Sequence, residues 1–284
     1  MPDQLSGGYP ASASSPAVPL PAEPAGYEPV APRGPAAYAA ELIGTLMLVF
    51  FICTVLTVEQ GGSTPYLDFA VIGLVHALVL SMLVYTLGGA SGAHFNPAVT
   101  TTLAALRKIA PLDAFIYIVV QLSGGILGAS LCKALLNGPG QDPVNYGAVG
   151  VSKLLHGSAG LALVAEIIGT FVLMWAIMGM AVNPRGERAL AGLVIGSTLG
   201  FAVMAIGPMT GASFNPARAL GPGLVANHFG PAGTWLLAYV VGPLIGAGLA
   251  GALYTLIVLG PQHREGRRPV DTLPRPTDSP APLP

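Results

Sequence analysis

Six long apolar stretches dominate the 284-residue sequence and restrict the folds that it can adopt. They cover residues 36–58, 69–87, 112–136, 161–182, 189–207 and 234–260. A lipid bilayer has a hydrocarbon core of about 30 Å, which an α-helix of roughly 20 apolar residues can cross. Charged residues make up only 9% of the chain, whereas soluble domains carry about 25%. We therefore expect an all-α membrane protein with six transmembrane helices.

The regions that flank these stretches differ from them in composition. Residues 1–35 are rich in Pro, Ala, Ser and Gly, and residues 261–284 are rich in Pro and carry several arginines. Such segments bury too little apolar surface to offset the entropy that is lost on ordering. We expect a disordered N-terminal tail at 1–35, a membrane domain at 36–260 and a disordered C-terminal tail at 261–284.

The basic residues predict how the membrane domain is oriented. An even number of spans leaves both termini on one side of the membrane. Of the arginines and lysines near the ends of the spans, only Lys133 and Lys153 fall on the other side. The basic residues on the side of the termini are Arg33, Arg107, Lys108, Arg185, Arg188, Arg264, Arg267, Arg268 and Arg275. The positive-inside rule places both termini in the cytoplasm, and we expect the cell (inner or plasma) membrane. The net charge of −1 provides no positive field for a nucleic acid, so no such partner is expected.

A repeated motif divides the membrane domain into halves, at 36–136 and 161–260. Residues 91–98 read Ser-Gly-Ala-His-Phe-Asn-Pro-Ala, and residues 210–217 read Thr-Gly-Ala-Ser-Phe-Asn-Pro-Ala. Residues 41–45 read Glu-Leu-Ile-Gly-Thr, and residues 166–170 read Glu-Ile-Ile-Gly-Thr. Each half holds three spans and one short apolar stretch, so the second half enters the membrane from the opposite face. This arrangement is an inverted repeat.

Each Asn-Pro-Ala motif has the signature of a helix start. Asn is a preferred N-cap, and Pro is favoured at the first helical position because it lacks an N–H. We expect short helices from 96 to about 106 and from 215 to about 225, each roughly 16 Å long, so that together they match one bilayer core. The motif residues are Asn96, Pro97, Ala98, Asn215, Pro216 and Ala217.

The two short helices predict a pore, since irregular backbone at membrane depth must be buried in protein or line water. Two helix N-termini that meet would contribute about +0.5 of an elementary charge each. The Asn96 and Asn215 amides would add donors directed into the lumen. The resulting positive centre would repel cations and protons.

The paired motifs, with Arg218 directly after the second, resemble those of the major intrinsic protein family, the aquaporins and glycerol facilitators. The resemblance covers about residues 36–260. It implies a right-handed bundle of six transmembrane helices and two re-entrant half-helices. It also implies one pore in each subunit and assembly as a homotetramer in the lipid bilayer.

The resemblance further implies a selectivity filter. The matching positions carry His76, Val203, Ala212 and Arg218, with His76 and Arg218 as donors and the other two setting the width. This combination resembles the filter of plant vacuolar water channels, which is associated with water and ammonia. Ala219 stands where glycerol facilitators usually carry Asp, which argues mildly against glycerol as the main solute.

Three further polar residues accompany the motifs. Glu41 and Glu166 lie inside apolar stretches, where a carboxylate is expensive and is usually functional or paired. We expect both to accept hydrogen bonds from loop N–H groups near the motifs, a role that the resemblance also implies. The alternative is that they relay protons in a transporter. His94 precedes the first motif, and we expect it to fix the loop.

The predicted function is a passive channel for water, and also for ammonia, that excludes protons and ions. It requires no catalytic residue, cofactor or metal. One alternative is a facilitator of glycerol or other small neutral solutes, built from the same parts with a wider opening. A coupled secondary transporter would also use inverted repeats and broken helices, but the sequence shows no carboxylate cluster for a coupling ion. A membrane enzyme would need a nucleophile with a base or a set of metal ligands, and neither is evident.

Overall fold

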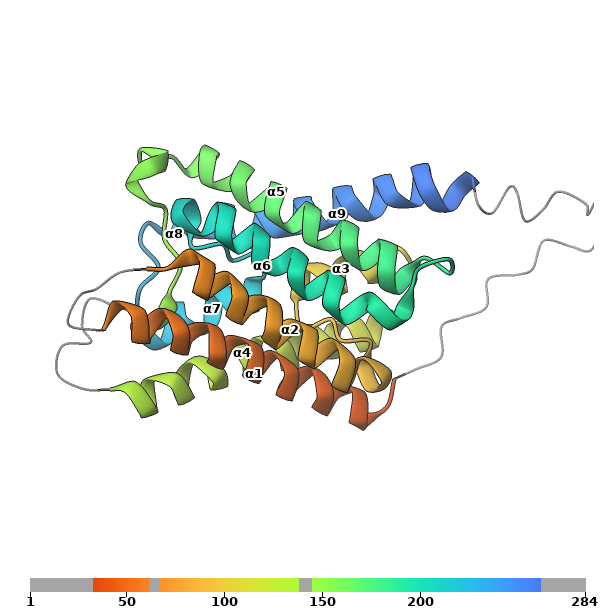
Figure 1. The fold of residues 1–284 in the computed structure, drawn as a ribbon, viewed down its shortest axis with the longest axis horizontal. Coiled ribbons are helices and arrows are strands. Elements are labelled where there is room, and N and C mark those ends of the chain that lie inside the picture. Colours follow the sequence, from red (N-terminus) through yellow and green to blue (C-terminus); the bar gives the residue numbers. More distant parts are fainter. Residues whose placement is uncertain (1–32, 62–66, 138–144, 262–284) are drawn as a thin grey trace, which may run out of the picture.

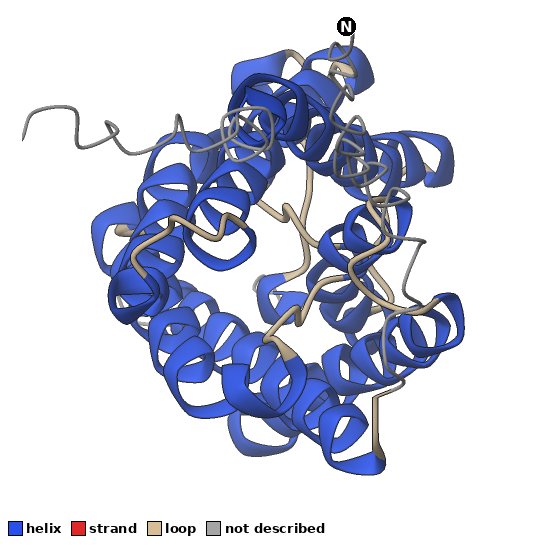
Figure 2. Ribbon diagram, turned by 90° about the vertical axis from the view of Figure 1, so that its right-hand side faces the viewer, coloured by secondary structure: helices blue, strands red, loops and turns tan. Residues whose placement is uncertain are grey.

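The computed structural model describes residues 33–61, 67–137 and 145–261. Apart from residues 33–35 and residue 261, the two predicted tails lie outside the described residues. Within the described ranges every regular element is helical (Figures 1 and 2).

Six helical spans are long and apolar enough to cross a membrane, which confirms the six predicted transmembrane segments. Three of them are single helices, namely α1 (Pro35–Gln60), α2 (Phe69–Ser91) and α4 (Pro111–Leu136). The fourth joins α5 (Ala159–Ile177) to the π-helical η3 (Met178–Val182), and the fifth joins η4 (Arg188–Leu190) to α6 (Ala191–Thr210). The sixth comprises α8 (Ala232–Leu236), η5 (Leu237–Val241), α9 (Gly242–Tyr254) and η6 (Thr255–Leu259).

Two short helices follow the repeated motifs. Helix α3 spans Pro97–Ala105 and helix α7 spans Pro216–Ala226, with Asn96 and Asn215 as their N-caps. The predicted start of each helix is therefore the observed one, and the predicted ends differ by one residue. Two further turns, η1 (Asn145–Gly147) and η2 (Lys153–Leu155), lie between the halves.

The packing of the helices reflects the inverted repeat. Helix α1 packs on α2 and α4, and in the same way α5 packs on α6 and α9. Each short helix packs on a long helix of the other half, α3 on α9 and α7 on α4. Helices α2 and α6 pack on each other, as do α3 and α7. Figure 2 shows the long helices as a ring, with the loops of the motifs crossing its interior.

Small residues allow the two halves to approach closely where α2 crosses α6. A Cβ atom on Gly73 would lie 2.7 Å from the carbonyl oxygen of Gly200, and one on Gly200 would lie 2.6 Å from that of Gly73. Close backbone approach through small residues is typical of helices packed in lipid. Large apolar side chains such as Leu78, Phe115 and Leu256 are exposed on the outside of the bundle, as expected of a surface in contact with lipid.

Candidate functional site

The asparagines of the two motifs cap the short helices. The Asn96 Oδ1 atom accepts a hydrogen bond of 2.9 Å from the Ala98 N–H, and the Asn215 Oδ1 atom accepts one of the same length from the Ala217 N–H. Each cap satisfies a donor that has no partner inside the helix. Pro97 and Pro216 occupy the first helical positions.

The same asparagines join the two halves of the chain. The Asn96 Nδ2 atom donates to the Phe214 carbonyl at 2.8 Å, and the Asn215 Nδ2 atom donates to the Phe95 carbonyl at 2.8 Å. The N-termini of α3 and α7 therefore meet inside the ring of long helices. An amide group carries two N–H donors, so one donor of each asparagine is used in this cross-link and one is left for the lumen. The sequence alone suggested that the donors point into the lumen, and it did not reveal the cross-link.

A buried carboxylate holds the first motif loop. The Glu41 side chain is fully buried, and its oxygens accept from the Ser91 hydroxyl at 2.6 Å, the His94 N–H at 2.9 Å and the Phe95 N–H at 2.7 Å. The Gln121 amide donates to it at 2.7 Å. These four bonds offset the cost of burying the carboxylate.

Glu166 holds the second motif loop in the same manner. It is fully buried and accepts from the Thr210 hydroxyl at 2.6 Å, the Ser213 N–H at 3.0 Å and the Phe214 N–H at 2.7 Å. Tyr117 and Tyr239 donate to equivalent carbonyls, those of Ser91 and Thr210, so the position equivalent to Gln121 is Pro243, and Glu166 lacks the fourth donor. Both glutamates thus accept N–H groups that belong to the loops.

The loops adopt backbone conformations that need this support. Ala93 and Phe95 have φ angles of 53° and 46°, and their counterparts Ala212 and Phe214 have φ angles of 45° and 52°. Left-handed backbone is strained for residues other than glycine and persists where the surroundings fix it. It turns the Phe95 and Phe214 carbonyls toward the asparagines of the opposite half.

Two glycines make room for the phenylalanines of the motifs. A Cβ atom on Gly169 would lie 2.0 Å from the Phe214 ring, and one on Gly44 would lie 2.1 Å from the Phe95 ring. We predict that Gly169→Ala destabilises the protein by about 1–3 kcal/mol, the usual cost of overpacking. The measurement is the free energy of unfolding in detergent. Gly248→Ala is the control, because a Cβ atom there would meet nothing within 4 Å, and equal stability of the two variants would contradict the prediction.

His94 belongs to a polar network that only the first loop has. Its Nδ1 atom lies 3.1 Å from the Thr100 hydroxyl, which accepts from the Gln121 amide at 2.9 Å. Its ring contacts that of Tyr117 edge to face at 5.2 Å. In the second half Thr100 is replaced by Ala219. The sequence singled out His94 but gave no signal for Thr100 or Gln121, because neither is repeated.

Three cavities follow one another through the bundle. The middle cavity shares His76 and Arg218 with a second cavity, here called the filter-side cavity, which also contacts Gln60 at the end of α1. It shares His94 and Val99 with a third, the termini-side cavity, which is lined by Arg33 near the start of α1. The three cavities therefore form a path from one end of the bundle to the other, and the middle one is the smallest.

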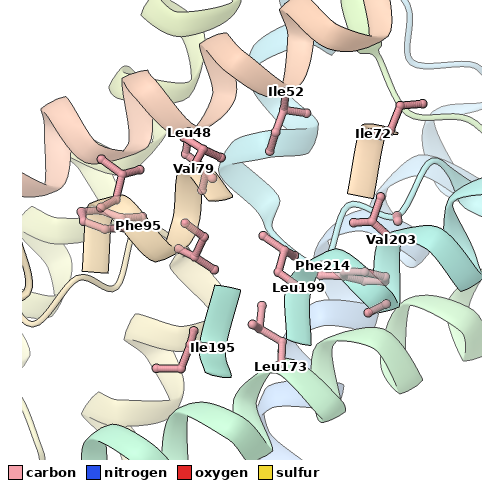
Figure 3. Close-up of a cluster of buried hydrophobic side chains, with 14 residues drawn as sticks. Leu48, Ile52, Ile72, Val79, Phe95, Leu173, Ile195, Leu199, Val203 and Phe214 are labelled. Atoms are coloured by element: carbon pink, nitrogen blue, oxygen red, sulfur yellow. The ribbon is translucent and has the colours of Figure 1, made fainter. Parts of the chain in front are cut away.

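The middle cavity has an apolar wall and a few polar groups. Figure 3 shows most of the apolar side chains, which come from α1, α2, α5, α6 and the motif loops. The apolar residues that line the cavity are Leu48, Ile52, Leu80, Ala93, Phe95, Val99, Leu173, Ile177, Ile195 and Leu199. The polar side chains are His76, His94, Asn96, Ser213, Asn215 and Arg218. Such a wall offers a permeant molecule only a small number of hydrogen-bonding partners.

The polar groups are distributed unequally between the two ends of this cavity. In the alignment of the two motifs, His76 corresponds to Ile195 and Arg218 corresponds to Val99. All four residues line the middle cavity. The inverted repeat would give two equivalent constrictions, and these two exchanges place the imidazole of His76 and the guanidinium of Arg218 together on the filter side, opposite apolar residues at the matching positions.

The structure brings together three of the four predicted filter residues. His76, Val203 and Arg218 line the filter-side cavity, and all three are almost completely buried. Ala212 is also buried but lines none of the three described cavities, whereas its neighbour Gly211 lines the filter-side cavity.

The two nitrogen-bearing residues of the filter are held by carbonyl groups. The His76 Nδ1 atom lies 2.8 Å from the Ile72 carbonyl, and an Arg218 guanidinium nitrogen donates to the Gly147 carbonyl at 2.8 Å. A carbonyl can only accept, so Nδ1 carries the proton and Nε2 of the neutral ring is an acceptor. Gly147 was not found from the sequence, because it lies outside the repeats.

Comparison with known proteins identifies this architecture. The family model described as major intrinsic protein matches residues 33–254. The chain belongs to the major intrinsic protein family. As a major intrinsic protein it is a passive channel for water or other small neutral solutes in a lipid bilayer, and it is not an enzyme.

Several major intrinsic proteins are similar to the chain over most of its length. Nodulin-26 of Glycine max is 41% identical over 208 residues, which cover 73% of this chain and 74% of that protein. A probable aquaporin of Archaeoglobus fulgidus is 38% identical over 239 residues, which cover 78% of this chain and 96% of that protein. A glycerol uptake facilitator-like protein of Lactiplantibacillus plantarum is 36% identical over 213 residues, which cover 75% of this chain and 94% of that protein.

Among solved structures, the aquaglyceroporin of Plasmodium falciparum matches with a TM-score of 0.69 and 21% identity, covering 81% of this chain and 98% of that one. This match supports the aquaporin-like fold. The resemblance of the filter to that of plant vacuolar water channels stays a prediction.

Proposed function

We propose that this channel conducts water in single file, with ammonia as a second solute, and excludes protons and other ions. The observation that carries the proposal is the meeting of the two helix N-termini at the smallest of three consecutive cavities. There the wall is mostly apolar, and the remaining N–H donors of Asn96 and Asn215 are suited to bind a water molecule by its oxygen.

Exclusion of protons and cations follows from the same geometry. The N-termini of α3 and α7 each contribute about half a positive charge at the middle cavity. Arg218 adds a full charge beside it. A water molecule that is bound by its oxygen at this point cannot accept a proton from its neighbour, and a cation meets a positive potential.

We propose that the protein lies in the inner or plasma membrane of the cell and that both of its termini face the cytoplasm. The start of α1 and the end of η6 lie at the same end of the bundle (Figure 1). Arg33, Lys108 and Arg188 line the cavity at that end, which agrees with the excess of basic residues on the cytoplasmic side. We also propose a homotetramer with one pore in each subunit, which light scattering of the purified protein can test.

The decisive experiment compares the permeability of proteoliposomes to water, ammonia and glycerol, by stopped-flow light scattering for water and glycerol and with an internal pH dye for ammonia. We predict that water permeability exceeds glycerol permeability, and that the double variant His76→Phe with Val203→His lowers glycerol permeability while water permeability is retained. The larger phenyl ring at 76 and the new imidazole ring at 203 would narrow the filter-side cavity at two of its walls. An unchanged ratio of glycerol to water permeability in the double variant would overturn the filter assignment.

A facilitator of glycerol or other small neutral solutes is the second candidate. Val203 and Gly211 give the filter-side cavity a small apolar wall, which could accommodate the carbon chain of such a solute. A glycerol permeability above that of water in the same proteoliposomes would establish this candidate in place of the first.

A further inference from the structure

Lys133 is a basic residue near the end of the apolar helix α4, and the proposed function does not use it. Its Nζ atom donates to the Val225 carbonyl at 2.9 Å, in the last turn of α7. The carbonyls of a last helical turn have no partners inside the helix and carry partial negative charge. Lys133 therefore caps the helix that carries Arg218.

The same ammonium group contacts the turn that receives Arg218. The Lys133 Nζ atom lies 5.5 Å from the centre of the Tyr146 ring, within the range of a cation–π interaction. Tyr146 belongs to η1, and the next residue, Gly147, provides the carbonyl that accepts from the Arg218 guanidinium at 2.8 Å.

The conformation of η1 requires external support. Asn145, Tyr146 and Gly147 have φ angles of 44°, 48° and 76°, so three consecutive residues are left-handed. This conformation is unfavourable for residues other than glycine, and for a bulky residue such as Tyr146 it is exceptional.

Contacts on several sides hold η1 in this conformation. The Tyr146 hydroxyl donates to the Asn137 side chain at 3.3 Å. Gly147 lies against α1, where an added Cβ atom would be 3.0 Å from Leu56 and 3.3 Å from the Cys53 backbone. Lys133 contacts both α7 and the Tyr146 ring, so it connects the donor side of the Arg218–Gly147 bond with the acceptor side.

We propose that Lys133 is a positioning residue that determines the selectivity of the pore. It fixes the Gly147 carbonyl relative to α7, and thereby fixes the Arg218 guanidinium across the filter-side cavity. When Lys133 is removed, η1 loses part of its support and the guanidinium gains freedom to move away from the lumen. This inference rests on the proposed role of Arg218 in the filter. The wider opening should increase glycerol permeability more than water permeability, because a water molecule already fits through the filter.

The test measures glycerol and water permeability of the full-length channel in proteoliposomes. For Lys133→Met, which keeps the apolar stem and removes the charge, the ratio of glycerol to water permeability should rise about 2- to 10-fold, the range that corresponds to one hydrogen bond. Lys133→Arg retains a cation and should restore the ratio. Lys153→Met is the matched control, because Lys153 is an exposed lysine in η2, which lies between the two halves as η1 does. This variant should leave the ratio unchanged.

The ratio separates a positioning role from a merely structural one, since a loss of folded channel lowers both permeabilities together. An unchanged ratio in Lys133→Met would overturn the inference. Arg218→Val separates this failure from that of the proposed function. If Arg218→Val raises the ratio and Lys133→Met does not, only the role of Lys133 is wrong, whereas if neither raises it, Arg218 is not a filter residue.

Discussion

Replacement of Glu166 by leucine is expected to destabilise the folded channel by about 2–6 kcal/mol. The carboxylate accepts from the backbone N–H groups of Ser213 and Phe214, and leucine would leave both donors buried without an acceptor. Each buried donor that loses its partner costs about 1–3 kcal/mol. The Thr210 hydroxyl, which also donates to Glu166, can rotate toward another acceptor and is left out of this sum. The free energy of unfolding in mixed detergent micelles provides the measurement.

Two comparisons make this result specific to the hydrogen bonds of Glu166. Ile168→Ala changes a neighbouring side chain on α5 that is 52% exposed, so it should alter the stability far less. Glu41→Leu should cost at least as much as Glu166→Leu, because it also frees the Gln121 amide. A Glu166→Leu protein as stable as Ile168→Ala would show that the second loop is held by other contacts.

The long and short helices could be predicted because their signals are local. Apolar length indicates each span, and caps such as Asp68, which accepts from the Ala70 N–H at 2.9 Å, indicate where a helix begins. The π-helical turn η5 within the sixth span was not predicted. It ends two residues before Pro243, which lacks an N–H and so leaves a carbonyl of the preceding turn without its usual partner.

The candidate site could be predicted as far as the repeats extend. Glu41 and Glu166 appear at equivalent positions of the two halves, and so do the capping asparagines. The hydrogen bond from Asn96 to Phe214 joins residues 118 positions apart, and no periodic pattern indicates such a pairing. Gly147 lies between the two halves, and Lys133, in the first half, belongs to none of the repeated motifs. Their role follows from where the segment between the halves lies on α4 and α7.

Replacement of Arg218 by valine is expected to increase the proton permeability of the channel by at least about tenfold. Valine is the residue at the equivalent position of the first motif, Val99, so the variant makes the two ends of the middle cavity more alike. Two unit charges 4 Å apart interact by about 4 kcal/mol at an effective dielectric constant of about 20, and removal of the guanidinium removes a repulsion of this order. The barrier from the two helix N-termini remains, so the increase should be smaller than this energy alone would allow. A pH-sensitive dye inside proteoliposomes reports the proton flux.

The charge-matched comparison for this variant is Arg188→Val. Arg188 lines the termini-side cavity, which is larger than the middle one, and water there screens its charge more strongly. Its removal should therefore change the proton flux much less than that of Arg218. Water permeability measured in the same vesicles shows that each variant is folded and open. If Arg218→Val conducts water and its proton flux equals that of the unmodified channel, the barrier to protons lies entirely at the two helix N-termini, and Arg218 serves only to set the width of the filter.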